Sequence, residues 1–551
     1  MGGEIRGLHE AAYLLGFFAL FSQILALIRD RLLASTFGAG HVLDVYYASF
    51  RIPDIIFVSV ASLVSVYVLI PFLTEKEGEG KEEQRTFINS VFTVFTTLML
   101  LISLIVFAFV PLLSRLLFPG LVDSPIFPEL VMLTRVLLLQ PLFLGLSNLF
   151  GSITQTRRRF LLYASGPLLY NIGIIGGILF LYPSFGIVGL AFGVVLGAVL
   201  HLLIQMPFII ADGFFPKVTL RPLWRDIRRV LRLSLPRTLA LSANQLSLVI
   251  LLGVASLLAA GSITIFNFAY NLQSVPLSII GVSYSVAAFP TLARLFTNGE
   301  RKLFLEQMIS ATRHIIFWSV PAIVLFVVLR AQIVRVILGG GVFDWTETRL
   351  VAAALALFVI SLIAQGLSLL FVRGYYATGN TRTPLVVNLL GAILVVVFSV
   401  ALLKLFNIFP TFRFFMEALL RVEGIEGTAI LMLPLGYSLA LFLNVVAFWF
   451  LFQRDFSSLW GAVSQTVLHS FGAAVLMGFV THRLLSVFDN IFDIHTFIGI
   501  FLQGLLSGLL GIIVGIVLLF LLRNKEIREI SSALHHKFWK STVVAPEQES
   551  I

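Results

Sequence analysis

Charged side chains gather near the end of the first long apolar segment, a place where membrane proteins usually carry few. Arg29 and Asp30 are followed by Asp44, Arg51 and Asp54, and the last two stand three residues apart within apolar sequence, on one helical face. The planar guanidinium group of Arg can bind phosphate oxygens through two parallel hydrogen bonds. The pattern therefore favours a cationic pocket for an anionic head group, with Arg29 and Arg51 as phosphate ligands and the three carboxylates in support.

Two alternatives to this pocket remain open. Arg29 could instead form an ion-pair network with Asp30 and Asp44 that ties two helix ends together, and Arg side chains beside a membrane span often snorkel to the interface. Arg237, next to Pro236 at the start of a later apolar segment, is either a third phosphate ligand or an interface anchor. We assign Arg237 to the predicted pocket.

The sequence shows no sign of catalytic chemistry. It lacks an H-E-x-x-H zinc motif, a nucleophile elbow and a Walker A sequence, so neither metal-dependent hydrolysis nor ATP hydrolysis is expected. It also has no Cys, which excludes thiolate nucleophiles, disulfides and iron–sulfur clusters. We therefore expect a transporter without a cofactor or metal, driven by substrate gradients, by ions or by the membrane potential.

The elements that position these residues are predicted to be transmembrane helices. Hydrophobic residues make up 58% of the 551 residues and charged residues 12%, about half the charged fraction of a soluble domain. Apolar runs of about 18 residues or more, long enough to cross a bilayer, recur throughout. The first run has no polar mature chain behind it, so it is expected to be a span and not a signal peptide. We predict an all-α polytopic membrane protein with about fourteen spans, at 11–28, 45–73, 88–117, 129–152, 161–182, 185–211, 233–260, 263–293, 314–338, 350–377, 383–407, 427–453, 459–482 and 493–522.

The connections between these spans alternate in charge, and this predicts the orientation. The positive-inside rule places loops rich in Lys and Arg in the cytoplasm, so both termini are expected there, in a bacterial cytoplasmic membrane. The net charge of +10 has the same source, and no nucleic-acid partner is expected. The basic loops hold Lys76, Lys81, Arg85, Arg157, Arg158, Arg159, Lys217, Arg221, Arg225, Arg228, Arg229, Arg232, Arg294, Arg301, Lys302, Arg313, Arg382 and Arg454, and the opposite loops are 119–128, 182–186, 259–262 and 489–495.

The connection at 408–427 is longer than the others and has a helical pattern. Phe415 and Leu419 alternate at helical spacing with Arg413 and Glu417, which gives one apolar and one charged face. We predict a helix lying in the outer interface of the membrane. A solvated loop helix is the alternative.

The chain repeats itself, and the repeat predicts its domains. Residues 19–27 are similar to 240–248, and the exits of spans four and ten, 151–159 and 374–384, share Gly, Thr and Arg. Two parallel copies of a six-span bundle, with a cleft between them, are the architecture of transporters in which one bundle rocks against the other to give alternating access. The predicted order is an N-lobe (1–211), a cytoplasmic linker (212–232), a C-lobe (233–453), two further spans (454–522) and a cytoplasmic basic tail (523–551). The prolines predicted to bend helices along the cleft are Pro53, Pro71, Pro276 and Pro290.

The stretch from Ser22 to Pro71 resembles the MurJ (MviN) lipid II flippase family, part of the multidrug/oligosaccharidyl-lipid/polysaccharide exporter superfamily. The resemblance covers nearly the whole chain. It implies fourteen helices in two lobes, a cationic cavity that holds a diphosphate, transfer of lipid-linked peptidoglycan precursor to the outer leaflet, and functional roles for Arg29, Asp30 and Asp44. The matching residues include Ile28-Arg29-Asp30, Phe37-Gly38-Ala39-Gly40, Asp44, Ala48-Ser49-Phe50-Arg51-Ile52-Pro53, Arg159-Phe160, Pro167, Asn171, Pro236, Gln245, Ala260-Gly261-Ser262, Pro276, Phe289-Pro290 and Asn380-Thr381-Arg382-Thr383-Pro384.

Several charged residues of the family pattern are replaced in this chain. Typical members carry Arg at the position of Gln23 and an Asp-Arg pair at Tyr270-Asn271. Gln23 and Asn271 are therefore predicted to be uncharged supporting residues of the cavity, while Arg51 and Arg237 supply compensating positive charge.

These observations predict a lipid II flippase that works by alternating access, as a monomer, among membrane lipids and cell-wall synthesis proteins. The first alternative is a flippase for another polyprenyl-linked glycan, of the O-antigen or capsule type. The second is a multidrug/cation antiporter, which calls for membrane carboxylates that are scarce here. The third is a scaffold that binds cell-wall enzymes without transporting anything.

Overall fold

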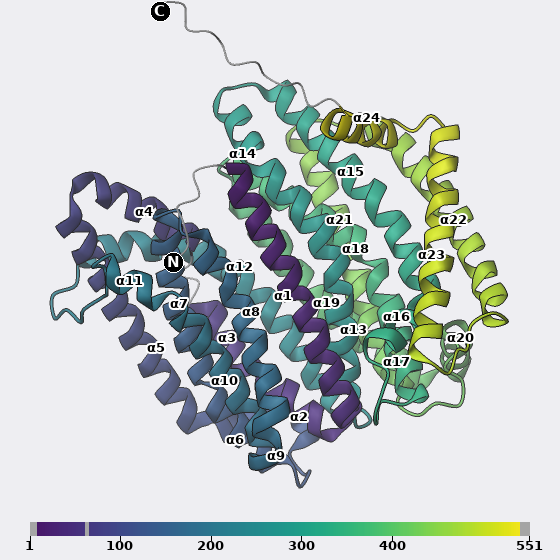
Figure 1. The fold of residues 1–551 in the computed structure, drawn as a ribbon, viewed down its shortest axis with the longest axis horizontal. Coiled ribbons are helices and arrows are strands. Elements are labelled where there is room, and N and C mark those ends of the chain that lie inside the picture. Colours follow the sequence, from purple (N-terminus) through teal and green to yellow (C-terminus); the bar gives the residue numbers. More distant parts are fainter. Residues whose placement is uncertain (1–7, 61–65, 540–551) are drawn as a thin grey trace, which may run out of the picture. The chain divides into compact units, whose positions relative to one another are not determined.

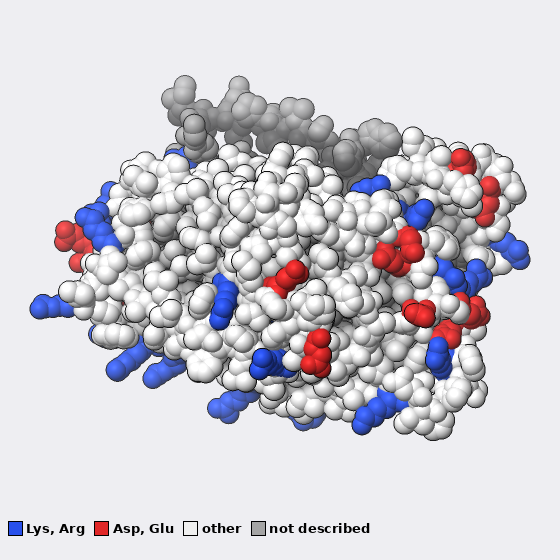
Figure 2. Space-filling view, turned by 90° about the horizontal axis from the view of Figure 1, so that it is seen from below, with Lys and Arg blue, Asp and Glu red and all other residues white. Residues whose placement is uncertain are grey.

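The chain folds into helices joined by short loops (Figure 1). The computed structural model describes residues 8–60 and 66–539, and the regular structure in these ranges is helical apart from one isolated β-bridge between Gly340 and Phe343. The all-α prediction is confirmed. Most of the surface visible in Figure 2 is uncharged.

Eleven of the predicted spans coincide with segments long and apolar enough to cross a bilayer. Among the described residues, ten are single segments, and the eleventh is the pair α17 (Trp345–Ile360) and α18 (Leu362–Ala377), bent by 40°. The other predicted spans lie on α1 (Leu8–Phe37), on α2 to α4, and on α12 (Trp224–Ser256), whose part Ser242–Ser256 is apolar. The helices thus have the length and composition of a multi-pass membrane protein.

The first of two compact units draws its described residues from Met1–Val275, Ile337–Phe358 and Thr381–Asn444. Phe72, Phe87 and Phe150, from three different helices, are buried in one apolar core of this unit. Its remaining helices are α2 (His41–Ser49), α3 (Arg51–Val60), α4 (Val66–Glu79), α5 (Lys81–Leu117), α6 (Phe127–Leu137), α7 (Leu139–Thr156), α8 (Phe160–Gly176), α9 (Tyr182–Phe185), α10 (Ile187–Leu203), α11 (Met206–Ala211), α13 (Ser262–Leu277), α19 (Arg382–Ile408) and α20 (Pro410–Leu420).

The second unit draws its described residues from Pro276–Val336, Val359–Asn380 and Val445–Ile551. Phe371 of α18 packs against Phe452 with 5.3 Å between ring centroids. Its helices also include α14 (Ser283–Thr297), α15 (Arg301–Val328), α16 (Arg330–Ile337), the end of α21 (Met432–Asp455), α22 (Trp460–Asp489), α23 (Phe497–Leu521) and α24 (Lys525–Trp539). The predicted lobes, 1–211 and 233–453, stay a prediction, because compactness does not test for a repeat.

The prolines predicted to bend helices occupy different kinds of position. Pro53 is the third residue of α3, where a helix loses no internal hydrogen bond to proline, so the break between α2 and α3 precedes it. Pro71 and Pro290 lie inside α4 and α14. Pro276 lies inside α13, just before a π-helical turn at Ser278–Val282. Their action as hinges stays a prediction.

The helix predicted within 408–427 is present as α20. Phe415 and Leu419 are 60% and 58% exposed, whereas Glu417 is buried and accepts a hydrogen bond of 2.9 Å from Nε of Arg413. The apolar face of α20 is therefore exposed. On its charged face, Glu417 is buried and paired with Arg413. The location of α20 in the outer membrane interface stays a prediction.

Candidate functional site

Arg29 and Asp30 lie inside α1 and not beyond its end. The prediction placed Arg29 just past the first span, but the helix continues to Phe37 because the residues that follow the charges, Leu33 and Ala34, are fully buried. The chain then turns at Gly38, which has a φ of +64°, a value that glycine adopts without strain.

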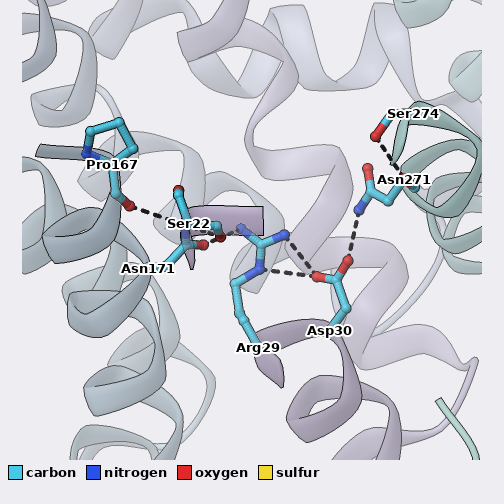
Figure 3. A network of polar contacts seen from close by, with 7 residues as sticks. All are labelled: Ser22, Arg29, Asp30, Pro167, Asn171, Asn271 and Ser274. Carbon is cyan, nitrogen blue, oxygen red and sulfur yellow. Dashed lines mark hydrogen bonds and ion pairs between the residues drawn. The ribbon is translucent and has the colours of Figure 1, made fainter. Parts of the chain in front are cut away.

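Asp30 holds the guanidinium group of Arg29 from one edge (Figure 3). Nε and Nη2 of Arg29 both donate to Oδ1 of Asp30, at 3.0 and 2.8 Å. The Asp30 side chain is 4% exposed and that of Arg29 is 19% exposed, so the pair sits largely away from solvent. Charge-assisted bonds of this kind are stronger than neutral ones.

Asn171 of α8 binds the other side of Arg29. Its Oδ1 accepts a hydrogen bond of 3.1 Å from Nη1, while its Nδ2 donates to the Pro167 carbonyl at 3.0 Å and to Oγ of Ser22 at 3.3 Å. Because the amide nitrogen is engaged in this way, the amide oxygen faces Arg29 (Figure 3). The sequence analysis counts Asn171 among the residues that match the family but gives it no role in the site.

Asn271 binds the second oxygen of Asp30, and its supporting role in a substrate cavity stays a prediction. Nδ2 of Asn271 donates to Oδ2 of Asp30 at 3.1 Å, and its carbonyl accepts a bond of 2.6 Å from Ser274 Oγ. The Asn271 side chain thus donates to Asp30 without adding charge.

Arg51 is held by a second amide group from α13. Its Nη2 donates a short hydrogen bond to Oδ1 of Asn267, and its Nη1 lies 3.9 Å from Oδ2 of Asp54, the partner predicted from their spacing. Asn267 also donates to the carbonyl of Ile263 at 2.7 Å, which orients its oxygen toward Arg51. Asn267 and Asn271 are one helical turn apart, so one face of α13 serves both charged groups. Asn267 was missed in the sequence, where its spacing from Asn271 was the available signal.

The two arginines are brought into one cluster by α13, since Asn267 binds Arg51 and Asn271 binds the Asp30 that holds Arg29. Tyr47 is buried and packs edge-on against Phe268 of the same helix, with 5.8 Å between ring centroids. The cluster combines two cations, a phenol and the three amides of Asn171, Asn267 and Asn271, residue types that can all donate hydrogen bonds to an anion.

Asp44 is not engaged with Arg29, so it takes no part in the ion-pair network that was the alternative to the predicted pocket. Its Oδ2 accepts a bond of 2.6 Å from the backbone N–H of Gly261, and its Oδ1 accepts bonds from N and Oγ1 of Thr264 at 2.8 and 2.7 Å. These groups stand at the start of α13, where free N–H groups and the helix dipole favour a carboxylate. Asp44 therefore caps a helix from a distant part of the chain.

The loop between α1 and α2 is held by α17 as well. The backbone N–H of Ala39 donates to Oε1 of Glu347 at 2.6 Å, and the N–H of Val342 donates to the carbonyl of Ser35 at 3.1 Å. A Cβ on Gly261 would come within 2.1 Å of the Ala39 carbonyl, so the backbones touch here. Glu347 was missed, because nothing in its local sequence marks a partner so distant in the chain.

Two predicted residues stand apart from this cluster. Gln23 lies on α1 and makes no side-chain hydrogen bond within the described part of the chain. Arg237 lies on α12, but its side chain is outside the described residues, so its role as a phosphate ligand stays a prediction.

Sequence comparisons find one family across most of the chain. The family model described as "Lipid II flippase MurJ" matches residues 33–503. A protein of Burkholderia cenocepacia named "Lipid II flippase MurJ" is 27% identical over 375 residues, which are 67% of this chain and 73% of the relative. A "Probable lipid II flippase MurJ" of Thermotoga maritima is 28% identical over 383 residues, 69% of this chain and 76% of the relative.

Solved structures share the fold. A lipid II flippase MurJ in an inward closed conformation superposes with a TM-score of 0.73 and 22% identity, covering 94% of this chain and all of that one. An inward-facing multidrug resistance transporter of the MATE family gives a TM-score of 0.62 and 16% identity, covering 79% of this chain and 95% of that one.

Proposed function

Because the chain belongs to the lipid II flippase MurJ family, we propose that it transfers lipid-linked peptidoglycan precursor from the cytoplasmic to the outer leaflet of a bacterial membrane. The observation that carries this proposal is the pair Arg29 and Arg51, which stand on helices of the membrane body and are joined through Asn267 and Asn271 of α13. Charged side chains inside a membrane usually mark a pathway or a ligand site. A lipid diphosphate is an anion suited to such a pair.

Arg29 and Arg51 are proposed to bind the diphosphate directly. Asp30 occupies one edge of the Arg29 guanidinium and Asn171 occupies Nη1, so a phosphate has to displace one of them. Asn171 is the weaker competitor because its amide oxygen carries no net charge. Asp30, itself held by Asn271, then keeps the guanidinium oriented.

The contacts around Asp44 are proposed to form a closed outer gate. They join the α1–α2 loop to the starts of α13 and α17, segments that belong to different predicted lobes. Alternating access requires contacts of this kind to form in one state and break in the other. With Lys- and Arg-rich loops and both termini in the cytoplasm, this end faces outward and the substrate enters from the cytoplasmic side.

Transport of lipid-linked precursor is tested with the purified chain in liposomes that contain fluorescent lipid II. The measurement is the fraction of label that an impermeant quencher reaches as a function of time. We expect transfer that stops when Arg29 is replaced by Ala and continues when the exposed Arg454, 70% accessible, is replaced by Ala. Equal transfer by wild-type and Arg29→Ala protein would refute the role assigned to Arg29.

The same liposomes separate the alternative functions. A polyprenyl-linked O-antigen unit transferred faster than lipid II would identify another glycan as the substrate. Uptake of drug cations without lipid transfer would identify an antiporter. A lack of activity toward lipid II, the O-antigen unit and drug cations would favour a scaffold that transports nothing. We further propose that the chain acts as a monomer beside cell-wall synthesis proteins. The transfer rate per chain tests whether a monomer is active, and crosslinking in cells tests which proteins lie beside it.

A further inference from the structure

The loop between α11 and α12 is fixed to the protein, although it has no regular secondary structure of its own (Figure 1). Phe214 is buried in the apolar core of the first unit. Three backbone N–H groups of the loop donate to polar side chains of α5: Lys217 to Asn89 at 2.7 Å, Thr219 to Thr93 at 3.0 Å and Leu223 to Ser90 at 3.0 Å. The side chains that this loop exposes are therefore held in place by its backbone.

Apolar side chains are exposed along the loop and the helix that follows. Val218 and Leu220 are 74% and 96% exposed, and Trp224, the first residue of α12, is 57% exposed. Leu231 and Leu235 continue the face of Trp224 at helical spacing and are 37% and 55% exposed. Exposed apolar side chains that gather in this way mark a contact with a membrane or with another protein.

Three cations stand beside these apolar side chains. Arg225, Arg228 and Arg232 are exposed and lie on one face of α12, since three and four positions separate them. Their guanidinium groups make no hydrogen bond, ion pair or ring contact with the described residues. The cationic face is thus open to a ligand.

The neighbouring carboxylates are already paired with other cations. Oδ2 of Asp226 lies 3.5 Å from Nζ of Lys76, and Oε1 of Glu75 lies 2.7 Å from Nη1 of Arg229. These contacts hold the start of α12 against α4. They leave the positive charge of Arg225, Arg228 and Arg232 unmatched within the described part of the chain.

The contacts with α5 indicate the level of this surface in the membrane. Asn89, Ser90 and Thr93 stand at the beginning of the predicted span 88–117, at the end of the span that carries basic loops. The positive-inside rule assigns that end to the cytoplasm, so the headgroups of the cytoplasmic leaflet are expected at the same level. Anionic lipids of that leaflet attract basic segments that lie close to it.

We propose that the linker surface, formed by Val218, Leu220, Trp224, Arg225, Arg228 and Arg232, binds anionic phospholipids of the cytoplasmic leaflet. The apolar side chains enter the boundary between headgroups and acyl chains, where tryptophan is favoured. The three guanidinium groups contact lipid phosphates. A soluble anion would meet the charge but would leave the apolar side chains in water. The surface is separate from the Arg29 cluster and does not depend on the proposed transport.

Fluorescence quenching by labelled lipids tests the linker surface in the full-length protein. Because the chain has no Cys, Leu220→Cys carries a single fluorophore. The quenchers are phosphatidylglycerol and phosphatidylcholine, each with a nitroxide near the start of one acyl chain and each added at the same mole fraction to phosphatidylcholine liposomes. We expect both lipids to quench and phosphatidylglycerol to quench more. The difference should shrink as salt is added, because salt screens exposed charges.

A triple variant tests the contribution of the arginines. Arg225→Gln, Arg228→Gln and Arg232→Gln, combined in the Leu220→Cys chain, should reduce the excess quenching by phosphatidylglycerol about five-fold or more, since each basic residue near an anionic surface contributes to binding. Quenching by phosphatidylcholine should stay unchanged. All three positions are exposed, so the fold is not expected to suffer.

Two controls accompany this variant. Replacing Arg294, Arg301 and Lys302 by Gln removes the same number of exposed charges from another basic loop and should leave the preference for phosphatidylglycerol unchanged. A fluorophore at Ile393→Cys, 53% exposed on α19, should be quenched equally by both lipids, because no cation of the linker surface lies on that helix.

Three results would overturn the proposal. A fluorophore at Leu220→Cys that neither lipid quenches would place the linker surface in water or against another protein. Equal quenching by the two lipids would remove the role of the arginines. An equal loss of preference in the two triple variants would indicate general attraction of anionic lipid to the basic side of the protein.

Discussion

Asp44 and Thr264 are joined by two hydrogen bonds to one carboxylate oxygen, from the threonine backbone N–H at 2.8 Å and from its hydroxyl at 2.7 Å. The two residues belong to helices far apart in the sequence, and both are buried. Their contact therefore fixes the start of α13 against α2, at the end of the molecule proposed to be the outer gate.

Replacing Asp44 by Asn should weaken this contact. The amide has one acceptor oxygen instead of two, and its NH₂ group would face the N–H of Gly261 or Thr264. We expect a loss of about 1.5–3 kcal/mol in the stability of the closed state, seen as a lower Tm in detergent and slower transfer of lipid II. Thr264→Val removes only the hydroxyl bond, so its effect should be smaller, and an equal effect of both variants would contradict the role of the helix terminus.

Arg29 should not be replaceable by Lys. Lysine keeps the charge but lacks the planar fork that meets Asp30 and Asn171 at once, so Arg29→Lys is expected to slow lipid II transfer by about ten-fold or more. Asn171→Ala keeps the fork and removes one acceptor, and it should slow transfer less. The opposite order of the two variants in the liposome assay would show that Asn171, and not Arg29, governs binding.

Variants of Asn271 separate the effect of charge beside Asp30 from the effect of the hydrogen bond that Asp30 accepts. Asn271→Asp places a second carboxylate beside Asp30 in a largely buried site, so like-charge repulsion should lower both Tm and transfer. Asn271→Arg supplies a charged donor to Asp30, so it should retain transfer. Asn271→Leu, which removes the donor without adding charge, is the control. Retained activity in the Asp variant combined with loss in the Arg variant would contradict this account.

The helix α24 should detach in acid. Glu526, only 1% exposed, accepts hydrogen bonds of 2.6 Å from Nε of Arg313 and from Oγ1 of Thr466. Burial alone raises the pKa of Glu526, but the bonds from Thr466 and Arg313 outweigh it and hold the pKa below its ordinary value of 4.5. The folded state therefore gains stability from ionised Glu526 at pH values above 4.5 and loses it as the pH falls below 4.5 through the folded pKa.

The measurement for Glu526 is Tm in detergent against pH. Wild-type protein should lose about 2–4 °C more than Glu526→Gln on acidification below pH 4.5, because the variant has no proton to take up at this position. Parallel curves for both proteins would show that another carboxyl group controls the acid response.

The exposed face of α20 should contact lipid chains. Because the chain has no Cys, a single spin label at Phe415→Cys reports its surroundings without background. We expect greater access to oxygen than to a water-soluble nickel complex at Phe415→Cys, as at Ile393→Cys on α19, and the reverse at Glu423→Cys in the following loop. A label at Phe415 that behaves like the one at Glu423 would favour the solvated alternative.

Much of the fold followed from the sequence. Hydropathy located nearly all membrane helices, because each apolar run must cover the bilayer core by itself and so carries its signal locally. Helix ends were less well predicted: α1 extends past Arg29 to Phe37, since a helix can continue beyond its apolar stretch when tertiary contacts bury the residues that follow. Pro53 was predicted to bend a helix, and only the structure shows that it is the third residue of α3, where a proline begins a helix without disturbing it.

The sequence by itself determined that this chain is a polytopic membrane protein and which charged residues are unusual within it, among them Arg29, Asp30 and Arg51. Composition, spacing and family motifs are properties of the linear chain, and they need no partner to be recognised. Only the tertiary structure decided how those charges are satisfied: Asp30 by Asn271, Arg51 by Asn267, and Asp44 by the start of α13. Each of these pairs joins residues more than two hundred positions apart, and the cost of burying an unpaired polar group brings them together only when the helices pack.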